Sequence, residues 1–181
     1  MAREDRDHWD DRYRSISDPG GEPQLPERFM PFAQVLAAAR DVLETASGAG
    51  HFSVWLAQQG ATVRGFDVSA VAVEQATQLA QHYKVAERCV FEVADLDYGL
   101  PTGPPVDLAV CNMFRDPELD QPLIDRLKPR GLIAVAALSE VGAKPGRFRA
   151  KPGELVEAFA GLAFLGHGEG DGVAWLVAQK S

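Results

Sequence analysis

The most informative pattern in this sequence is VLETASGAGHF, residues 42–52. It opens with a short apolar segment typical of a buried strand, continues through a loop with Gly48 and Gly50, and enters a helical pattern at His51. Glycine has no Cβ, so the backbone of such a loop can approach a ligand closely. In open α/β sheets the loops at the carboxyl ends of the strands border nucleotide sites. The stretch therefore predicts a strand, a ligand-binding turn and a helix.

Strands and helices alternate along the chain beyond this stretch. The predicted strands are 42–45, 62–66, 89–93, 108–111 and 132–138, and the predicted helices between them are 51–59, 69–83 and 117–127. Most of the strands read as nearly continuous apolar runs, which suits parallel strands covered on both faces. This alternation predicts a single Rossmann-like, doubly wound α/β sheet.

The end of the chain departs from a purely parallel pattern. After a helix predicted near 154–160, two short apolar runs at 162–165 and 173–178 are joined by the glycine-rich segment 166–172. So short a connection can only turn the chain back, so the two runs predict an antiparallel hairpin. We expect about seven strands, mostly parallel, with this hairpin at the C-terminus.

The first 40 residues predict a helical cover. Trp9, Tyr13 and Ile16 recur at helical spacing, which indicates an amphipathic helix within 1–16. After a loop rich in proline and glycine, a second helix is expected over 27–40 with Pro31 in its first turn. The whole chain, 1–181, is thus expected to be one domain with a cover over 1–40 and a Rossmann-like core over 41–181.

Composition excludes several classes of protein. The formal net charge of −8 argues against nucleic acid as a partner, since such binding depends on neutralising phosphates. No apolar run approaches the roughly 20 residues that span a bilayer, and the charged N-terminus does not resemble a secretory signal. The two cysteines and four histidines show no metal-ligand spacing, so no metal is expected. We expect a cytoplasmic monomer or weak dimer.

Acidic residues end three successive strands. Glu44, Asp67 and Asp95 follow the first, second and third runs, and parallel strands end at one edge of the sheet. An acid at the end of the second strand can accept both ribose hydroxyls of a bound adenosine. Each acid alone is commonly a cap, but the set of three favours a ligand site.

These stretches resemble a known family, the class I methyltransferases that use S-adenosylmethionine (SAM). Residues 43–50, LETASGAG, are similar to its first motif, acid-x-Gly-x-Gly-x-Gly, with Ala46 in place of the first glycine. Residues 67–69 and 94–96 resemble the second and third motifs, and LKPRG at 127–131 resembles the turn before the fifth strand, with Arg130 in place of a glycine.

Two further stretches narrow the resemblance. HWDDRY at 8–13 resembles an N-terminal motif of the small tellurite-resistance and thiopurine methyltransferase-like group, and KPGEL at 151–155 is similar to a segment of its tellurite-resistance branch. The resemblance covers nearly the whole chain. It implies SAM as cofactor and a small-molecule methyl acceptor.

The resemblance also implies a set of cofactor-binding residues. Glu44 would orient loop waters or the methionine amino group, Asp67 would hold the ribose, Asp95 would accept from the adenine amino group, and Asn112 would border the sulfonium. The complete set is Glu44, Ala46, Gly48, Gly50, Asp67, Val68, Asp95, Leu96 and Asn112.

The acceptor is expected to be a thiol, a chalcogen oxyanion or another anionic small molecule. Transfer from a sulfonium is an in-line displacement, so positioning supplies much of the acceleration. Candidate residues for this role are Asn112, Arg115 and Tyr13. A basic run at 144–151 is either a solvated loop or an anion site, because guanidinium groups bind oxyanions bidentately. The residues expected to bind the acceptor are Trp9, Tyr13, Arg115, Arg147 and Arg149.

Two alternatives remain open at this point. An NAD-dependent oxidoreductase shares the glycine loop and the acidic second strand, but its fingerprint asks for a third glycine where this chain has Ser53. A non-catalytic SAM-binding protein is favoured by the replaced glycines at Ala46 and Arg130. Comparing the affinities for SAM and NAD separates the first alternative, and turnover separates the second.

Overall fold

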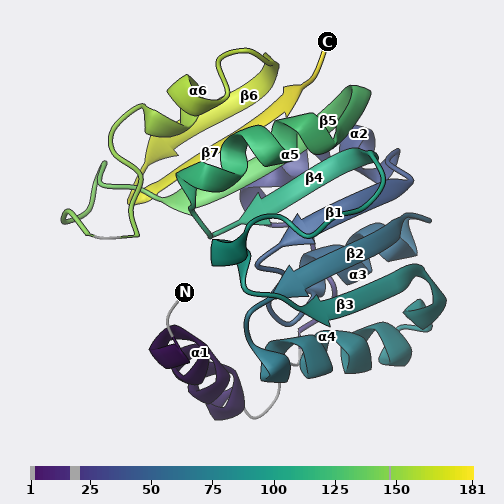
Figure 1. Cartoon of the computed structure of the whole chain (residues 1–181). Helices are drawn as coiled ribbons and strands as arrows, with labels where there is room; N and C mark the ends of the chain where they lie inside the picture. The colour runs from purple at the N-terminus through teal and green to yellow at the C-terminus, as the bar shows by residue number, and fades with distance from the viewer. Residues whose placement is uncertain (1–2, 17–20, 147) are drawn as a thin grey trace.

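The computed structural model describes residues 3–16, 21–146 and 148–181, and within them one seven-stranded sheet in the order β3-β2-β1-β4-β5-β7-β6 (Figure 1). The first five strands pair in parallel, and β7 pairs antiparallel with both β5 and β6. The fold class expected from the sequence is confirmed. The strands are β1 (Asp41–Thr45), β2 (Thr62–Asp67), β3 (Cys89–Val93), β4 (Val106–Asn112), β5 (Leu127–Leu138), β6 (Ala163–Gly170) and β7 (Val173–Gln179).

Helices cover both faces of the sheet. One face packs against α2 (Ala33–Ala37) and α3 (His51–Gln58), with α4 (Ala70–His82) beside α3 and β3. The other packs against α5 (Asp120–Arg126) and α6 (Glu154–Ala158). Within β1, Val42 belongs to the first core and Leu43 to the second, as the alternation of side chains along a strand requires. The apolar strands are therefore buried from two sides.

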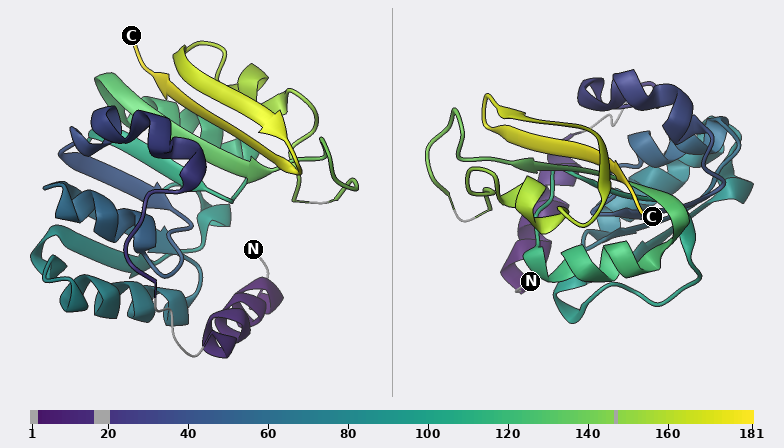
Figure 2. Two further views of the ribbon diagram at one scale, coloured as in Figure 1. Left: turned by 180° about the vertical axis from the view of Figure 1, so that it is seen from behind. Right: turned by 90° about the horizontal axis from the view of Figure 1, so that it is seen from above.

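The helix α1 (Arg3–Ser15) lies beyond the carboxyl ends of the parallel strands, apart from both layers (Figures 1 and 2). Polar contacts attach it to α4. The Asp10 carboxylate accepts from the Ser69 hydroxyl at 2.5 Å, and Gln75 Nε2 donates to the Tyr13 carbonyl at 3.0 Å. The amphipathic helix expected near the N-terminus thus covers the edge where ligands bind in open α/β sheets.

The single helix expected over 27–40 is wrong. The segment forms the 3-10 helix η1 (Glu27–Phe32) and then the short α2. Pro31 has no N–H to donate back to residue 27 and its ring crowds the preceding turn, so an α-helix cannot run through it. Phe29 and Leu36 are nevertheless buried, and Val35 is exposed.

The glycine-rich connection expected over 166–172 is also wrong. Residues 163–170 continue as β6, and the chain turns at Asp171 and Gly172, which both have positive φ. A Cβ on Gly166 would lie 2.4 Å from a ring carbon of Phe32, and one on Gly168 would lie 2.7 Å from Trp175 Nε1. These glycines make room for aromatic rings within a strand, so they do not form a loop.

The remaining element boundaries shift by less. The helix expected over 117–127 is the 3-10 helix η4 (Pro117–Leu119) followed by α5, and β5 begins at Leu127. Ala46 and Arg130, which stand where the family pattern has glycines, have φ of 51° and 63°. The backbone therefore keeps the left-handed conformation that glycine adopts freely, at a cost of about 1–2 kcal/mol for each L-residue.

Candidate cofactor and acceptor site

A cavity of about 470 Å³ opens at the carboxyl ends of β1, β2 and β4 beneath α1. Its volume is typical of small-molecule sites. Mainly apolar side chains line it, and its polar groups are few. The lining residues are Trp9, Arg12, Tyr13, Ile16, Ala46, Asp67, Val68, Ala94, Leu96, Asn112, Met113, Phe114 and Leu138.

Asp67, the last residue of β2, is the carboxylate of this cavity. Its side chain is 6% exposed, and burial raises its pKa above the ordinary value. One carboxylate oxygen accepts from Gly48 N–H at 2.8 Å and the other from Ser69 N–H at 2.9 Å. These bonds fix the carboxylate between the glycine loop and the start of α4. A carboxylate oxygen can accept more than one bond, so Asp67 retains capacity for hydroxyls in the cavity.

Glu44 lies beneath the loop and not in the cavity. It is 3% exposed, and its carboxylate accepts from the hydroxyl of Ser53 in α3. Burial raises the pKa of Glu44 to about 8, although the bond from Ser53 opposes the shift. The carboxyl group of Glu44 thus joins β1 to α3, and a contact with loop waters or the methionine amino group stays a prediction. Ser53, where a dinucleotide fingerprint has its third glycine, is the partner that this carboxyl requires.

The two glycines of the loop have different surroundings. A Cβ on Gly48 would lie 2.7 Å from the Tyr13 hydroxyl, so this glycine lets α1 approach the loop. Gly50 begins α3 with φ of 81°, and a Cβ there would lie 2.7 Å from that of Ala76 in α4. Gly50 thus allows close packing of α3 against α4, and its place in the cofactor-binding set stays a prediction.

At the end of β3, Leu96 lines the cavity and Asp95 does not. Asp95 begins the 3-10 helix η3 (Leu96–Tyr98), where its carboxylate accepts from Asp97 N–H at 3.1 Å. Leu96 is 4% exposed and, with Val68 from the end of β2, forms an apolar wall of the cavity. The predicted contact of Leu96 with an adenine ring fits this wall, and a contact of Asp95 with adenine stays a prediction.

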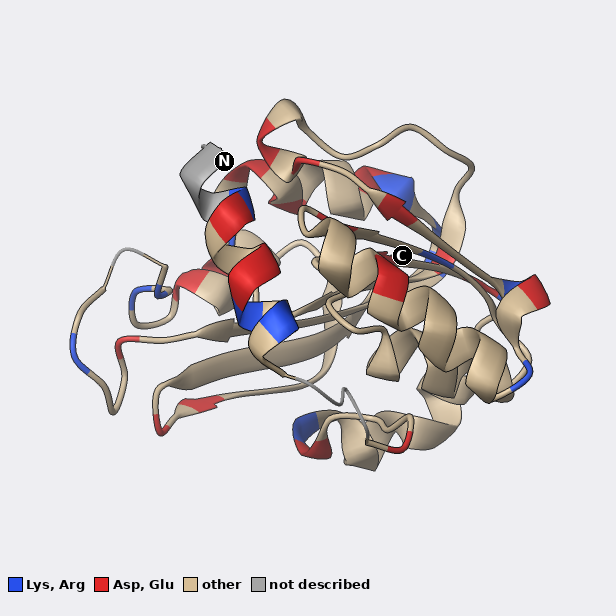
Figure 3. Ribbon diagram, turned by 90° about the horizontal axis from the view of Figure 1, so that it is seen from below, with Lys and Arg blue, Asp and Glu red and all other residues tan. Residues whose placement is uncertain are grey.

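Trp9 and Tyr13 of α1, together with Ile16 directly after the helix, cover the cavity as the helical spacing indicates. Burial and the nearby Asp67 raise the pKa of the Tyr13 phenol to about 12, so Tyr13 stays protonated at neutral pH and is a hydrogen-bond donor. Arg12 also lines the cavity, with its guanidinium 5.5 Å from the centre of the Trp9 ring. The sequence alone does not mark Arg12 as a cavity residue, because α1 carries many charges of both signs (Figure 3).

Asn112, Met113 and Phe114 form the wall at the end of β4. Met113 has φ of 61°, and its N–H donates to the Ala136 carbonyl at 2.7 Å, so the chain turns out of the sheet at this point. Arg28 from η1 donates to Asn112 Oδ1 at 3.2 Å. The sequence alone does not mark Arg28 as a neighbour of Asn112, since 84 residues separate the two.

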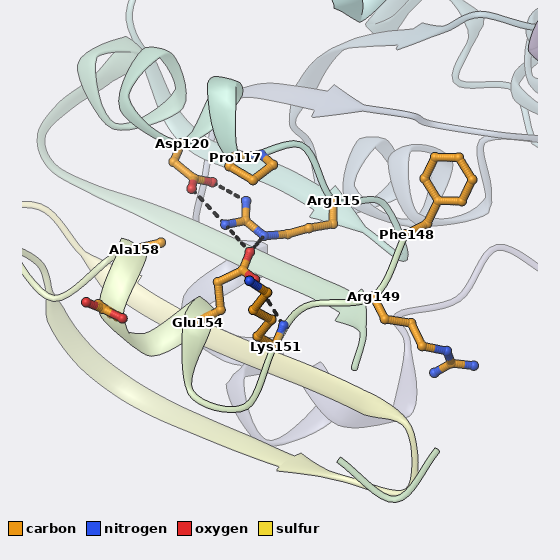
Figure 4. Close-up of a pocket in the computed structure, with 9 residues that line it drawn as sticks. Arg115, Pro117, Asp120, Phe148, Arg149, Lys151, Glu154 and Ala158 are labelled. Atoms are coloured by element: carbon orange, nitrogen blue, oxygen red, sulfur yellow. Dashed lines mark hydrogen bonds and ion pairs between the residues drawn. The ribbon is translucent and has the colours of Figure 1, made fainter. Parts of the chain in front are cut away.

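Arg115, which the sequence suggested as an acceptor-binding residue, already has anionic partners in the fold. Its guanidinium is paired with both oxygens of Asp120 at 2.6 and 2.9 Å and with Glu154 at 3.0 Å (Figure 4). The side chain is 7% exposed, and these two carboxylates already satisfy a guanidinium ion. Arg115 therefore joins the β4–α5 loop to α6.

Arg149 is likewise committed to structure. Its Nη1 donates to the Ser139 carbonyl at 2.7 Å and to the Gly172 carbonyl at 3.2 Å. These bonds join the loop after β5 to the end of that strand and to the start of β7. Arg147 lies outside the described residues. A second cavity of about 550 Å³ beside this loop is lined by the Arg115 cluster together with Phe148, Arg149 and Lys151 (Figure 4). Neither Arg115 nor Arg149 lines the cavity beneath α1, and binding of the acceptor by these residues stays a prediction.

The main cavity fits SAM. A buried carboxylate lies at the end of the second strand, where a ribose would be held, and an apolar wall from Val68 and Leu96 adjoins it. The glycine loop passes close by, linked to the same carboxylate through Gly48. Fold and site together define an α/β protein with an adenosyl-type cavity at the carboxyl edge of its sheet.

Comparison with known proteins identifies the family. A model of the methyltransferase domain matches residues 42–131, the segment from β1 into β5. The chain is a class I SAM-dependent methyltransferase, which sets aside the dehydrogenase alternative. No curated protein matches the sequence.

Several solved structures share the fold. TehB from Haemophilus influenzae is 16% identical over 96% of this chain and 67% of TehB, with a TM-score of 0.76. The magnesium protoporphyrin IX methyltransferase ChlM from Synechocystis PCC 6803, solved with bound SAH, is 19% identical over 97% of this chain and 98% of ChlM, with a TM-score of 0.70. The CcbJ methyltransferase from Streptomyces caelestis is 16% identical over 96% and 98%, with a TM-score of 0.75.

Proposed function

We propose that this methyltransferase acts on a small molecule that arrives as a soft or anionic nucleophile, a thiolate or a chalcogen oxyanion. SAM, when bound, supplies an electrophilic methyl group on a sulfonium. The observation that carries the proposal is the lining of the cavity. Among its described residues there is no histidine, lysine or glutamate, and its one carboxylate, Asp67, is already bonded to two backbone N–H groups.

Apart from Asp67, which we assign to the ribose, the described side chains of the cavity can bind and orient an acceptor but do not supply a base. Tyr13, with a pKa near 12, is protonated at neutral pH, and Asn112 and Arg12 do not accept protons there. A hydroxyl or amine acceptor usually wants a general base within hydrogen-bond reach. A nucleophile that is already ionised needs only alignment and exclusion of water, which the apolar walls and α1 provide.

The non-catalytic alternative does not gain support at the replaced glycines. Ala46 and Arg130 both hold the positive φ that a glycine would take there, so the loop geometry is kept despite the substitutions. Turnover with any member of a panel of thiols, chalcogen oxyanions and small phenols supports the enzyme. Binding of SAM without turnover on that panel would favour a binding protein.

The pH profile for thiol acceptors tests the absence of a base. We expect kcat/KM to rise tenfold per pH unit below the pKa of the thiol, ordinarily about 8.5, and to level above it. Because the ionising group belongs to the acceptor, a more acidic aromatic thiol should shift the midpoint downward by the difference between the two pKa values. The measurement is steady-state turnover with both thiols under saturating SAM.

The stability of the protein across the same pH range serves as the control for this profile. A midpoint that stays at one pH for both thiols would assign the ionisation to the protein and contradict the proposal.

A further inference from the structure

The side chain of Asn112 has a fixed orientation. Arg28 Nη1 lies 3.2 Å from the Asn112 Oδ1 atom, and a guanidinium has donors and no acceptor. The amide must therefore turn its oxygen toward Arg28, since the reverse orientation would set two donors against each other. The Asn112 Nδ2 group, with two N–H donors, is left for other partners. Within the described part of the chain, no protein group accepts from it.

Arg28 is held in place by its neighbours along the chain. Leu25 is 5% exposed and Phe29 is fully buried, with the Phe29 ring stacked on Phe52 of α3 at a centroid distance of 5.8 Å. These anchors fix η1 against the sheet and leave Arg28 half-buried between them. In the described residues its side chain meets no carboxylate, in contrast to the doubly paired Arg115. Among the described residues, the bond to Asn112 is the only one its guanidinium makes, so other N–H donors of Arg28 are left for a ligand or solvent.

The wall at the end of β4 thus offers donors and positive charge. Asn112 lines the cavity, its amide N–H groups are not used by the bond from Arg28, and Arg28 contacts Asn112 without lining the cavity itself. Arg12 adds a second guanidinium from α1. The cavity carboxylate, Asp67, belongs to a different strand end and is bonded to the glycine loop. A ligand group with lone pairs and negative charge is the complement of such a wall.

We propose that Arg28 is a positioning residue that sets the Asn112 amide to donate to an anionic acceptor, and that the Arg28–Asn112 pair thereby selects anions. This inference rests on the proposed function, because it assigns the acceptor end of the same cavity. Arg28 acts through Asn112 and through its charge, and neither residue takes a proton. The pair lies outside every stretch that carried the family resemblance.

The test measures binding, so it does not depend on turnover. The full-length protein is loaded with S-adenosylhomocysteine (SAH), and the dissociation constants of para-fluorobenzoate and of its neutral amide are measured by fluorine NMR. The wild type should bind the carboxylate more tightly than the amide. Arg28→Gln should weaken carboxylate binding about tenfold or more, as expected for a hydrogen-bonded charge, and leave amide and SAH binding unchanged. Arg28→Lys, which keeps the charge, should restore part of the loss.

Arg88→Gln is the matched control, since Arg88 is exposed and its guanidinium donates to the Gly60 carbonyl at the opposite end of the strands. It changes the net charge equally and should leave all three constants at the wild-type values. Unchanged carboxylate binding in Arg28→Gln, or equal losses for both probes, would overturn the inference. Loss of SAH affinity in Arg28→Gln would also overturn it, by assigning the pair to the cofactor. Failure of the wild type itself to bind SAH would instead overturn the proposed function.

Discussion

Replacing Asp67 with asparagine is expected to weaken binding of SAM and of SAH by about 1.5–3 kcal/mol, or roughly 10- to 150-fold. The carboxylate lines the cavity while it accepts from Gly48 and Ser69 N–H groups, so its charge serves the loop and the ligand together. Asparagine keeps one acceptor oxygen and loses the charge, and its NH2 group cannot accept ribose hydroxyl protons. The measurement is calorimetric titration of both proteins with SAH.

Asparagine is the informative replacement at this position, because alanine would leave two buried N–H groups unpaired. An unpaired buried group costs about 1–3 kcal/mol, which would mix a loss of stability with a loss of affinity. Asp125→Asn is the matched control, since Asp125 is exposed on α5 and bonded to Gln121. A folded Asp67→Asn protein with wild-type affinity for SAH would remove Asp67 from the cofactor site.

The second large effect concerns stability and Glu44. The pKa of Glu44 is about 8 in the folded chain and about 4.5 for an ordinary glutamate, so the folded state keeps a proton that the unfolded chain releases between these pH values. The free energy of unfolding should therefore fall as pH rises from about 4.5 to 8 and level off above that range. This difference between the pKa of Glu44 in the folded and in the unfolded chain corresponds to a loss of about 5 kcal/mol.

Glu44→Gln should remove this pH dependence. The glutamine amide oxygen can still accept from the Ser53 hydroxyl, and the side chain never carries a charge into the core. Urea unfolding of wild type and variant at pH 5, 7 and 9 gives the difference directly, with contributions from other titrating groups cancelling. The variant should gain stability over the wild type as pH rises. A difference that stays constant from pH 5 to pH 9 would contradict a buried, neutral Glu44.

Local sequence patterns predicted the layers of this fold well. The strand–helix alternation depends on side-chain spacing within a segment, and β3 was expected with the bounds that the structure shows. The patterns failed where a distant residue decides the local structure. Gly166 and Gly168 look like loop residues until Phe32 and Trp175 are placed against them. Pro31 was expected near the first turn of an α-helix, but the structure forms a 3-10 helix there.

For the site, the sequence indicated the carboxyl edge and Asp67, but it could not show which cations are already paired in the fold. Arg115 and Arg149 appeared available because their partners, Asp120, Glu154 and two backbone carbonyls, become neighbours only on folding. Arg28 escaped notice for the converse reason, since nothing in its own segment marks it as a neighbour of Asn112. The charge of a residue is visible in a sequence, whereas the number of its unpaired donors is a property of the fold.

A single titration shows whether the cavity at the carboxyl edge binds an adenosyl sulfonium and its product. The purified chain is titrated calorimetrically with SAM, SAH and NAD under identical conditions. The geometry of Asp67, Val68 and Leu96 predicts micromolar binding of SAM and SAH and no measurable binding of NAD. Binding of NAD with no heat from SAM or SAH would contradict the account.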